Sequence, residues 1–212
     1  MSRYREIIPN RPLHRSPDCS RVQPRFILAS GSPRRRQLLT EAGYKFEALS
    51  PPIGEVEHRW LTVRELTIWN AARKAARVSK MSPDAVVLGA DTLVTIDGEV
   101  LGKPADLEDA VRILRRLSGR AHEVWTAVRI CHAAQGRSQS FHEVSRVHFR
   151  KLDDRAIRHY LAKIEPLDKA GAYAAQGHGT EIIERIDGSF SNVVGLPMEK
   201  TARALRGFGV TP

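Results

Sequence analysis

The 212-residue sequence has little cysteine and no long hydrophobic run, and both absences narrow what the protein can be. Its two cysteines, Cys19 and Cys131, form neither a CxxC pair nor a Cys/His spacing, which argues against a disulfide framework and a zinc site. The sequence contains no 18-residue apolar run and no apolar signal region, so neither a transmembrane helix nor a secretory signal is predicted. We therefore expect a cytoplasmic protein with no membrane partner.

Several common nucleotide-binding and hydrolase motifs are also missing. The sequence has no G-x-G-x-x-G, no G-x-x-x-x-G-K-[ST], no HExxH and no G-x-S-x-G. These absences argue against a dinucleotide-binding fold, a P-loop, a zinc protease and an α/β-hydrolase elbow. The composition, with 42% hydrophobic and 27% charged residues, is instead that of an ordinary soluble globular domain.

The charge balance favours an anionic partner. With 34 Lys and Arg against 24 Asp and Glu, the formal net charge is +10, which fits nucleic acid, anionic lipid or a small phosphorylated ligand. Residues 1–24 combine scattered arginines with four prolines and lack any hydrophobic period, so we predict a mobile basic extension there and one folded domain over 25–212. The clearest basic run is short, Arg34-Arg35-Arg36, and a nucleic-acid partner is not expected.

Hydrophobic periodicity predicts strands and helices in mixed order. A capping box, Thr62-x-x-Glu65, opens a long helix whose apolar face would carry Val63, Leu66, Trp69 and Ala76. The order predicts an α/β fold with a mixed sheet and two lobes around one cleft. Strands are predicted at 26–29, 85–90, 92–96, 99–101, 122–132, 140–150 and 180–187, and helices at 33–42, 62–80, 106–117, 153–163 and 197–206.

The first candidate site is the loop Ser30-Gly31-Ser32-Pro33-Arg34-Arg35, between a short strand and a helix. Ser32 suits the N-cap and Pro33 the first helical position. The backbone N–H groups of a helix start attract anions, and nearby arginines can bind phosphate oxygens. The alternative is an ordinary capped helix with a solvated basic first turn. Because arginine at a helix N-terminus opposes the helix dipole, we favour a bound anion.

The second candidate site is Asp91-Thr92, which follows the apolar run 85–90. A carboxylate at the end of a buried strand can bind a divalent metal or accept a proton from water. It can also simply cap a turn. Lys103 lies beyond a predicted Asp97-Gly98 hairpin that could return it to the same end of the sheet, although most lysines are surface residues.

The third candidate site is the small-residue segment 171–179, GAYAAQGHG. Its glycines and alanines leave room for a ligand near the backbone. Gln176 offers both a donor and an acceptor, which suits recognition of a base edge. A flexible connector is the alternative reading of this segment.

Taken together, these sites resemble the Maf-type nucleoside triphosphate pyrophosphatases. The resemblance runs from about residue 25 to 209, and its motifs occur in the family's order and spacing. It rests on LASGSPRR (28–35), GADT (89–92), GKP (102–104), LSG (117–119), HEV (122–124), PLDKAGAY (166–173) and NVVGLP (192–197).

The resemblance implies a two-lobed fold of the Maf and inosine triphosphatase type, often dimeric, with the active site between the lobes. It implies metal-dependent hydrolysis of a nucleoside triphosphate to the monophosphate and pyrophosphate. By motif, Asp91 is the general base. Glu55 and Asp91 bind a divalent cation, Mg²⁺ or Mn²⁺, and Lys103 and Glu55 belong to the catalytic set. Ser30, Arg35, Lys74 and Lys103 hold the phosphates. Gly54 departs from the acidic residue that the family commonly has there, which weakens the assignment of Glu55.

Three positions point to a substrate branch. Arg34, Thr92 and Gln176 resemble the dTTP/UTP branch, whereas the 7-methyl-GTP branch tends to have an aromatic residue, Gln and Glu at these places. We therefore predict hydrolysis of dTTP and UTP, with these three residues also binding substrate. The alternatives are a 7-methyl-GTP pyrophosphatase, or a nucleotide- or nucleic-acid-binding regulator of cell division without robust catalysis.

Overall fold

The computed structural model describes residues 23–50 and 60–212. All but the last two residues of the predicted extension over 1–24 lie outside the described residues, so the extension stays a prediction. Glu55 also lies outside them. No helix of the described part of the chain is long and apolar enough to cross a bilayer.

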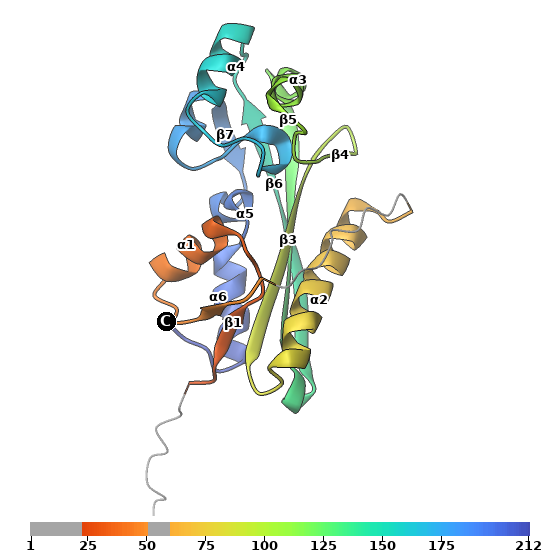
Figure 1. Cartoon of the computed structure of the whole chain (residues 1–212), viewed down its shortest axis with the longest axis vertical. Helices are drawn as coiled ribbons and strands as arrows, with labels where there is room; N and C mark the ends of the chain where they lie inside the picture. The colour runs from red at the N-terminus through yellow and green to blue at the C-terminus, as the bar shows by residue number, and fades with distance from the viewer. Residues whose placement is uncertain (1–22, 51–59) are drawn as a thin grey trace, which may run out of the picture.

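A mixed seven-stranded sheet runs through the molecule (Figure 1). The strand order is β2-β1-β3-β5-β6-β7, and β4 pairs with β3 off this path. β1 pairs in parallel with β2 and β3, and the other pairs are antiparallel. This confirms the predicted mixed α/β fold. The strands are β1 (Phe26–Leu28), β2 (Glu47–Ala48), β3 (Val86–Ile96), β4 (Glu99–Leu101), β5 (Ala121–His132), β6 (Arg137–Phe149) and β7 (Ile183–Asp187).

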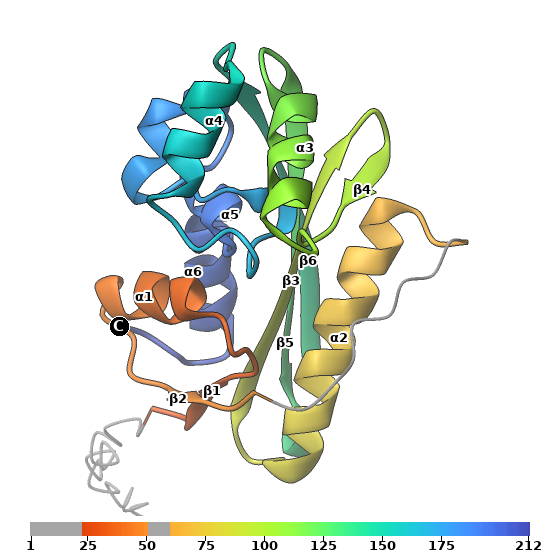
Figure 2. The same ribbon diagram turned by 45° about the horizontal axis from the view of Figure 1, so that its top comes forward.

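Helices cover both faces of the sheet. α2 lies alone against one face, while α1 and α6 at one end and α4 at the other lie on the opposite side (Figure 2). The short α5 had no clear periodic signal in the sequence and was not predicted. The helices are α1 (Pro33–Glu41), α2 (Val63–Met81), α3 (Leu107–Leu117), α4 (Asp154–Leu161), α5 (Phe190–Val194) and α6 (Met198–Gly207).

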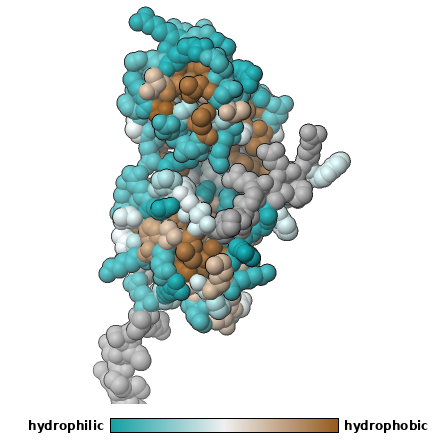
Figure 3. Space-filling view, viewed as in Figure 1, coloured by the Kyte–Doolittle hydropathy of each residue, from teal (hydrophilic) through white to brown (hydrophobic). Residues whose placement is uncertain are grey.

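The described residues form three hydrophobic clusters, and the two larger ones define two lobes of the molecule. One core joins α1 and α6 to the first half of β3 and includes Leu39, Leu88 and Leu205. The other joins α3 and α4 to the far end of β3 and includes Ile96 and Leu114. In Figure 3 the visible apolar side chains gather in two areas, one over each lobe, with hydrophilic side chains between them. The long strands β3, β5 and β6 connect the lobes, as Figure 1 shows.

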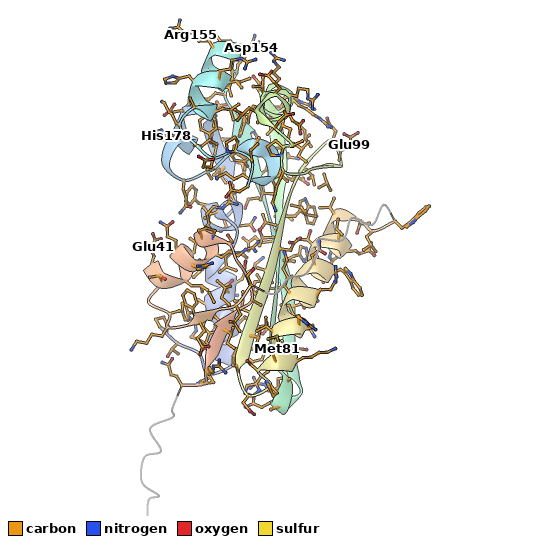
Figure 4. The ribbon with its side chains drawn as sticks, in the orientation of Figure 1. Glu41, Met81, Glu99, Asp154, Arg155 and His178 are labelled. Carbon is orange, nitrogen blue, oxygen red and sulfur yellow. The ribbon has the colours of Figure 1, made fainter. Side chains whose placement is uncertain are left out.

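Many surface charges are paired. Asp154 and Glu99 are both labelled at the outer edge in Figure 4. Arg115 Nη2 lies 2.5 Å from Asp154 Oδ2, and Arg116 Nη2 lies 2.6 Å from Glu99 Oε2. His178, also labelled there, lies 2.7 Å from Glu181. Exposed pairs of this kind contribute about 0–1 kcal/mol each. These surface pairs therefore contribute little to stability compared with burial of apolar side chains.

The prediction that a strand ends just before Asp91 is wrong. β3 continues through Asp91 to Ile96 because β5 pairs with it over its whole central length, with Asp91 opposite Ala127. The strand that ends here is β1, whose last partner on β3 is Leu88. Asp91 therefore lies in the middle of a long strand.

The end of β1 leaves a gap along one edge of β3. β5 occupies the other edge, so β1 and β4 share this one: β1 pairs with Val86–Leu88 and β4 with Val94–Ile96. Among the described residues, no strand pairs with Gly89–Leu93 on that edge. Ligands of α/β proteins commonly bind beyond the carboxyl end of a parallel strand. The gap next to the end of β1 is such a place.

The predicted apolar face of α2 is partly wrong. The capping box is present, with Thr62 N donating to Glu65 Oε2 at 2.9 Å. Trp69, however, is 52% exposed, and the buried face includes the polar residue Asn70. The reason is Gly89 on β3. A Cβ there would lie 2.5 Å from the Ala71 carbonyl oxygen, so the helix approaches β3 closely and turns its small and polar side chains inward.

The β3–β4 hairpin confirms its predicted turn. Asp97 and Gly98 have φ values of 54° and 78°, the positive pair that a type I′ turn requires. The hairpin brings the segment after β4, with Lys103, back towards β3.

Candidate active site

A pocket of about 390 Å³ opens at the gap between β1 and β4 along the edge of β3. Its size suits a small ligand. It combines the three segments that the sequence predicts as sites. Glu55 lies outside the described residues and cannot be placed. Every other predicted site residue lines the pocket: Ser30, Arg34, Arg35, Lys74, Asp91, Thr92, Lys103 and Gln176.

The first wall is the loop between β1 and α1. Ser32 caps α1, its Oγ accepting a hydrogen bond from the Arg35 backbone N–H at 3.4 Å. Ser30 is buried, and its Oγ accepts from the Ser32 N–H at 3.3 Å. The loop thus places the start of a helix at the pocket, where backbone N–H groups favour an anion.

The side chain of Arg35 is held in place by four protein acceptors. It is only 8% exposed. Nε donates to Gly195 O at 2.8 Å, Nη1 to Ser30 Oγ and Ala90 O at 3.0 Å each, and Nη2 to Thr92 Oγ1 at 2.9 Å. The side chain points to the β1–α1 loop, where Nη1 contacts Ser30. Its positive charge therefore has a fixed position in the pocket wall.

Asp91 lies on the opposite side of β3, against α2, and is 4% exposed. Lys74 Nζ donates to its Oδ1 at 2.6 Å, and Asn70 Nδ2 to its Oδ2 at 3.3 Å. Asn70 and Lys74 are four residues apart and so share one face of the helix. Gly89, two residues before Asp91 on the same face of β3, lets α2 come close enough for both contacts.

Sequence reasoning missed Asn70. Asparagine is usually exposed and is a poor helix former, yet Asn70 is 5% exposed in the middle of α2. The available signal was its spacing of four residues from Lys74, next to the small residues Ala71 and Ala75. The apolar face predicted for this helix did not include Asn70, so the spacing was not used.

Another wall of the pocket is the small-residue segment 171–179, which a buried aromatic residue anchors. Tyr173 is 4% exposed, and its hydroxyl lies 2.8 Å from His122 Nε2. Burial, with a smaller contribution from nearby His148, lowers the pKa of His122 to about 4, and burial raises the pKa of Tyr173 well above its usual value. His122 is therefore neutral at pH 7, and the pair fixes Tyr173 beside Gln176, which is half-buried at the pocket.

Comparison with known proteins identifies the chain. The family described as "Maf-like protein" matches residues 25–208. The chain belongs to the Maf family. Its relatives include a protein of Pelotomaculum thermopropionicum, 46% identical over 184 residues, a match that covers 87% of this chain and 96% of the relative. Another, from Bdellovibrio bacteriovorus, is 44% identical over 192 residues, covering 88% and 100%. Both relatives carry the name "dTTP/UTP pyrophosphatase".

The described residues of this Maf protein provide no protein-only metal cage. They contain no cluster of three or more His, Cys, Asp or Glu side chains suited to a metal ion. Asp91 is the buried carboxylate of the pocket, and Asp168 also lines it. Mg²⁺ commonly uses one or two carboxylates together with substrate phosphate oxygens. Asp91 therefore fits a cation that arrives with a phosphorylated substrate.

The three branch positions of the Maf protein all reach the pocket but differ in their surroundings. Arg34 and Gln176 are half-buried in the lining. Thr92 is also half-buried, but its hydroxyl is already hydrogen-bonded to Arg35 and lies 3.0 Å from Thr126 Oγ1. The lining also contains apolar groups that could contact a ring, among them Val94 and Tyr173.

Proposed function

We propose that this Maf protein hydrolyses dTTP and UTP to the nucleoside monophosphate and pyrophosphate in the pocket beside β3. The name shared by its relatives supports the activity and the substrates. One observation carries the assignment of the site: a single pocket brings the cations Arg35, Lys74 and Lys103 together with one buried carboxylate, Asp91. Binding a polyphosphate and activating water need those two kinds of group.

The triphosphate binds against the wall formed by the β1–α1 loop. The N–H groups at the start of α1 and the guanidinium of Arg35 provide positive potential whose position is set before substrate arrives. Preorganised donors of this kind stabilise developing charge without having to reorient during the reaction. Lys103, an exposed residue of the pocket lining, adds a further positive charge.

Asp91 accepts the proton of the attacking water. Its two oxygens are oriented by Lys74 and Asn70, and a carboxylate has about four acceptor positions, so these contacts leave room for a water molecule. The ion pair with Lys74 holds the carboxylate beside the phosphates, which Lys74 is also proposed to bind. General-base assistance of this kind contributes about 10²–10⁴ in rate.

Asp91 would also hold a divalent cation, Mg²⁺ or Mn²⁺, together with substrate phosphate oxygens, and Glu55 is proposed as a second ligand. When bound, the cation neutralises phosphate charge. Activity after chelation and restoration with each metal tests this requirement. Full turnover in the presence of excess chelator would contradict it.

Arg34, Thr92 and Gln176 are proposed to select the pyrimidine substrates. Gln176 can pair with a base edge through its donor and its acceptor. Because the Thr92 hydroxyl is bonded to Arg35, Thr92 acts on substrate through that arginine.

The test is pyrophosphate release from dTTP, UTP, dCTP and 7-methyl-GTP, with Asp91→Asn as a control for contaminating phosphatases. We expect turnover of dTTP and UTP to exceed that of 7-methyl-GTP. The reverse ranking would reassign the substrate branch. If the wild type and Asp91→Asn release equally little pyrophosphate from every nucleotide, the enzyme assignment fails.

A homodimer is proposed from the family resemblance alone. Sedimentation of the full chain, with and without dTTP, measures its mass directly, and a monomer at all concentrations would contradict the dimer. Salt-sensitive binding to DNA that is lost on deleting residues 1–24 would instead support a nucleic-acid-binding role.

A further inference from the structure

We infer that Thr126, a buried threonine on β5 outside the pocket lining, is a positioning residue that orients Arg35 for triphosphate binding. It acts through Thr92. The inference rests on the proposed function, since Arg35 is assigned to the phosphates there. Neither the pocket lining nor the sequence motifs draws attention to Thr126.

Thr126 and Thr92 face each other directly across the β3–β5 ladder. Their Oγ1 atoms lie 3.0 Å apart, and Thr126 is 0% exposed. Thr126 Oγ1 also donates to the carbonyl oxygen of Asn192 at 3.1 Å. The two hydroxyls therefore form a bridge between Arg35 and α5.

The direction of this bridge is fixed by its two ends. Arg35 can only donate and a carbonyl oxygen can only accept. Each hydroxyl has a single hydrogen. Because Thr126 donates its hydrogen to the Asn192 carbonyl, the contact between the two threonines must be donated by Thr92. Thr92 in turn accepts from Arg35 Nη2. All hydrogens thus point one way, from the guanidinium to the carbonyl. Such a chain holds the lone pairs of Thr92 towards Arg35.

The accepting end of the bridge is rigid. Asn192 is 0% exposed, and its Nδ2 donates to Val124 O and to Ser145 Oγ, each at 3.0 Å. The same segment also provides Gly195 O, which accepts from Arg35 Nε. Two acceptors of Arg35 therefore depend on the segment 192–195. Gly195 O belongs to this segment, and Thr92 Oγ1 is connected to it through Thr126 and the Asn192 carbonyl.

Without the Thr126 hydroxyl, Thr92 loses the acceptor that fixes the direction of its hydroxyl hydrogen. Thr92 Oγ1 can also donate to Gly195 O, 3.5 Å away. That carbonyl already accepts from Arg35 Nε, so Thr92 would compete with the arginine for it. One of the four contacts that hold the guanidinium then weakens, and phosphate binding weakens while Asp91, on the other face of β3, keeps its partners.

The experiment compares Thr126→Val, which keeps the shape but removes the hydroxyl, with Thr126→Ser, which keeps the hydroxyl. The matched control is Thr201→Val on α6, because Thr201 is also 0% exposed and its hydroxyl has no hydrogen-bond partner among the described residues. Steady-state kinetics with dTTP give KM and kcat. Calorimetric binding of inorganic pyrophosphate gives a readout that needs no turnover, and thermal unfolding gives the stability of each variant.

For Thr126→Val we expect KM for dTTP and Kd for pyrophosphate each to rise about tenfold, as for loss of a hydrogen bond to a charged group. We expect kcat to stay within about threefold, Thr126→Ser to restore both constants, and Thr201→Val to leave them unchanged. A lower melting temperature with unchanged KM and Kd would overturn the inference, because Thr126 would then be structural only. If the wild type binds pyrophosphate but hydrolyses no nucleotide, the proposed function fails while the pyrophosphate comparison still tests Thr126.

Discussion

Asp91 and Thr92 are neighbours in sequence, yet they lie in two different environments on opposite faces of β3. Asp91 faces α2, where Lys74 and Asn70 contact its carboxylate. Thr92 faces α1 and α5, where it belongs to a bridge of hydroxyls and carbonyls that ends on Arg35. Alternation along a strand sends adjacent side chains to opposite faces. Because the pocket lies at the gap along the edge of β3, both Asp91 and Thr92 line it.

The comparison suggests a division of labour between the two faces. On the α2 side, the carboxylate of Asp91 and the side chain of Lys74, which is 16% exposed, form an ion pair that lines the pocket. On the other side, the partners are backbone carbonyls and hydroxyls in one arrangement, among them the fully buried hydroxyl of Thr126. The first face therefore suits chemistry and the second suits a fixed anion site.

The largest effect is expected for Asp91→Asn. The amide keeps the size of the side chain but cannot accept a proton as a carboxylate does, so kcat for dTTP should fall by about 10²–10⁴. Pyrophosphate release under saturating dTTP and metal measures it. A variant with more than about a tenth of wild-type kcat would show that Asp91 is not the base.

Gly89→Ala should disturb the α2 face. The added Cβ would lie 2.5 Å from Ala71 O and 2.6 Å from Ala75 N. Because both are backbone atoms, α2 must move, at a cost of about 1–3 kcal/mol in free energy of unfolding. Urea unfolding measures this.

The control for that substitution is Gly207→Ala at the end of α6, where an added Cβ meets nothing within 4 Å. We expect kcat to fall in Gly89→Ala, since Lys74 and Asn70 move with the helix, and to stay unchanged in Gly207→Ala. Equal stability and activity in the two variants would contradict the close approach of α2.

Asn70→Leu removes one of the two contacts that orient Asp91 and should lower kcat about tenfold, the usual ratio for one hydrogen bond to a charged group. KM should change little, because the Thr92 face is untouched. Thr67→Val is a matched control, since Thr67 is buried on the same helix but its hydroxyl bonds only the Val63 carbonyl. Equal loss of kcat in both variants would show that the effect comes from the helix rather than from Asp91.

His122 is expected to affect stability rather than activity, and only at low pH. Its pKa is about 4 in the folded protein against an unperturbed 6.5, so the unfolded state binds more protons between these values. The free energy of unfolding should therefore fall as the pH drops from 6.5 to 4, by about 3 kcal/mol from this residue.

His122→Gln should remove that part of the pH dependence, because the amide does not titrate. Urea unfolding of both proteins at pH 7 and pH 4.5 gives the difference. Parallel stability curves for the two proteins would contradict a buried neutral histidine.

Local patterns gave the helix starts, the hairpin turn and the residues of the β1–α1 loop. Ser32, the Thr62–Glu65 box and Asp97-Gly98 are decided by neighbours in sequence, so their structures could be predicted. Asn70 and Thr126 could not, because their roles come from contacts 21 and 34 positions away. The continuity of β3 was missed for the same reason, since the pairing with β5 keeps Asp91 inside the strand.

The most direct test of the division between the two faces measures kcat and KM for dTTP in Asp91→Asn and Thr126→Val side by side, at saturating metal. We predict that Asp91→Asn loses mainly kcat and that Thr126→Val raises mainly KM. Loss of the same parameter by the same factor in both variants would contradict it.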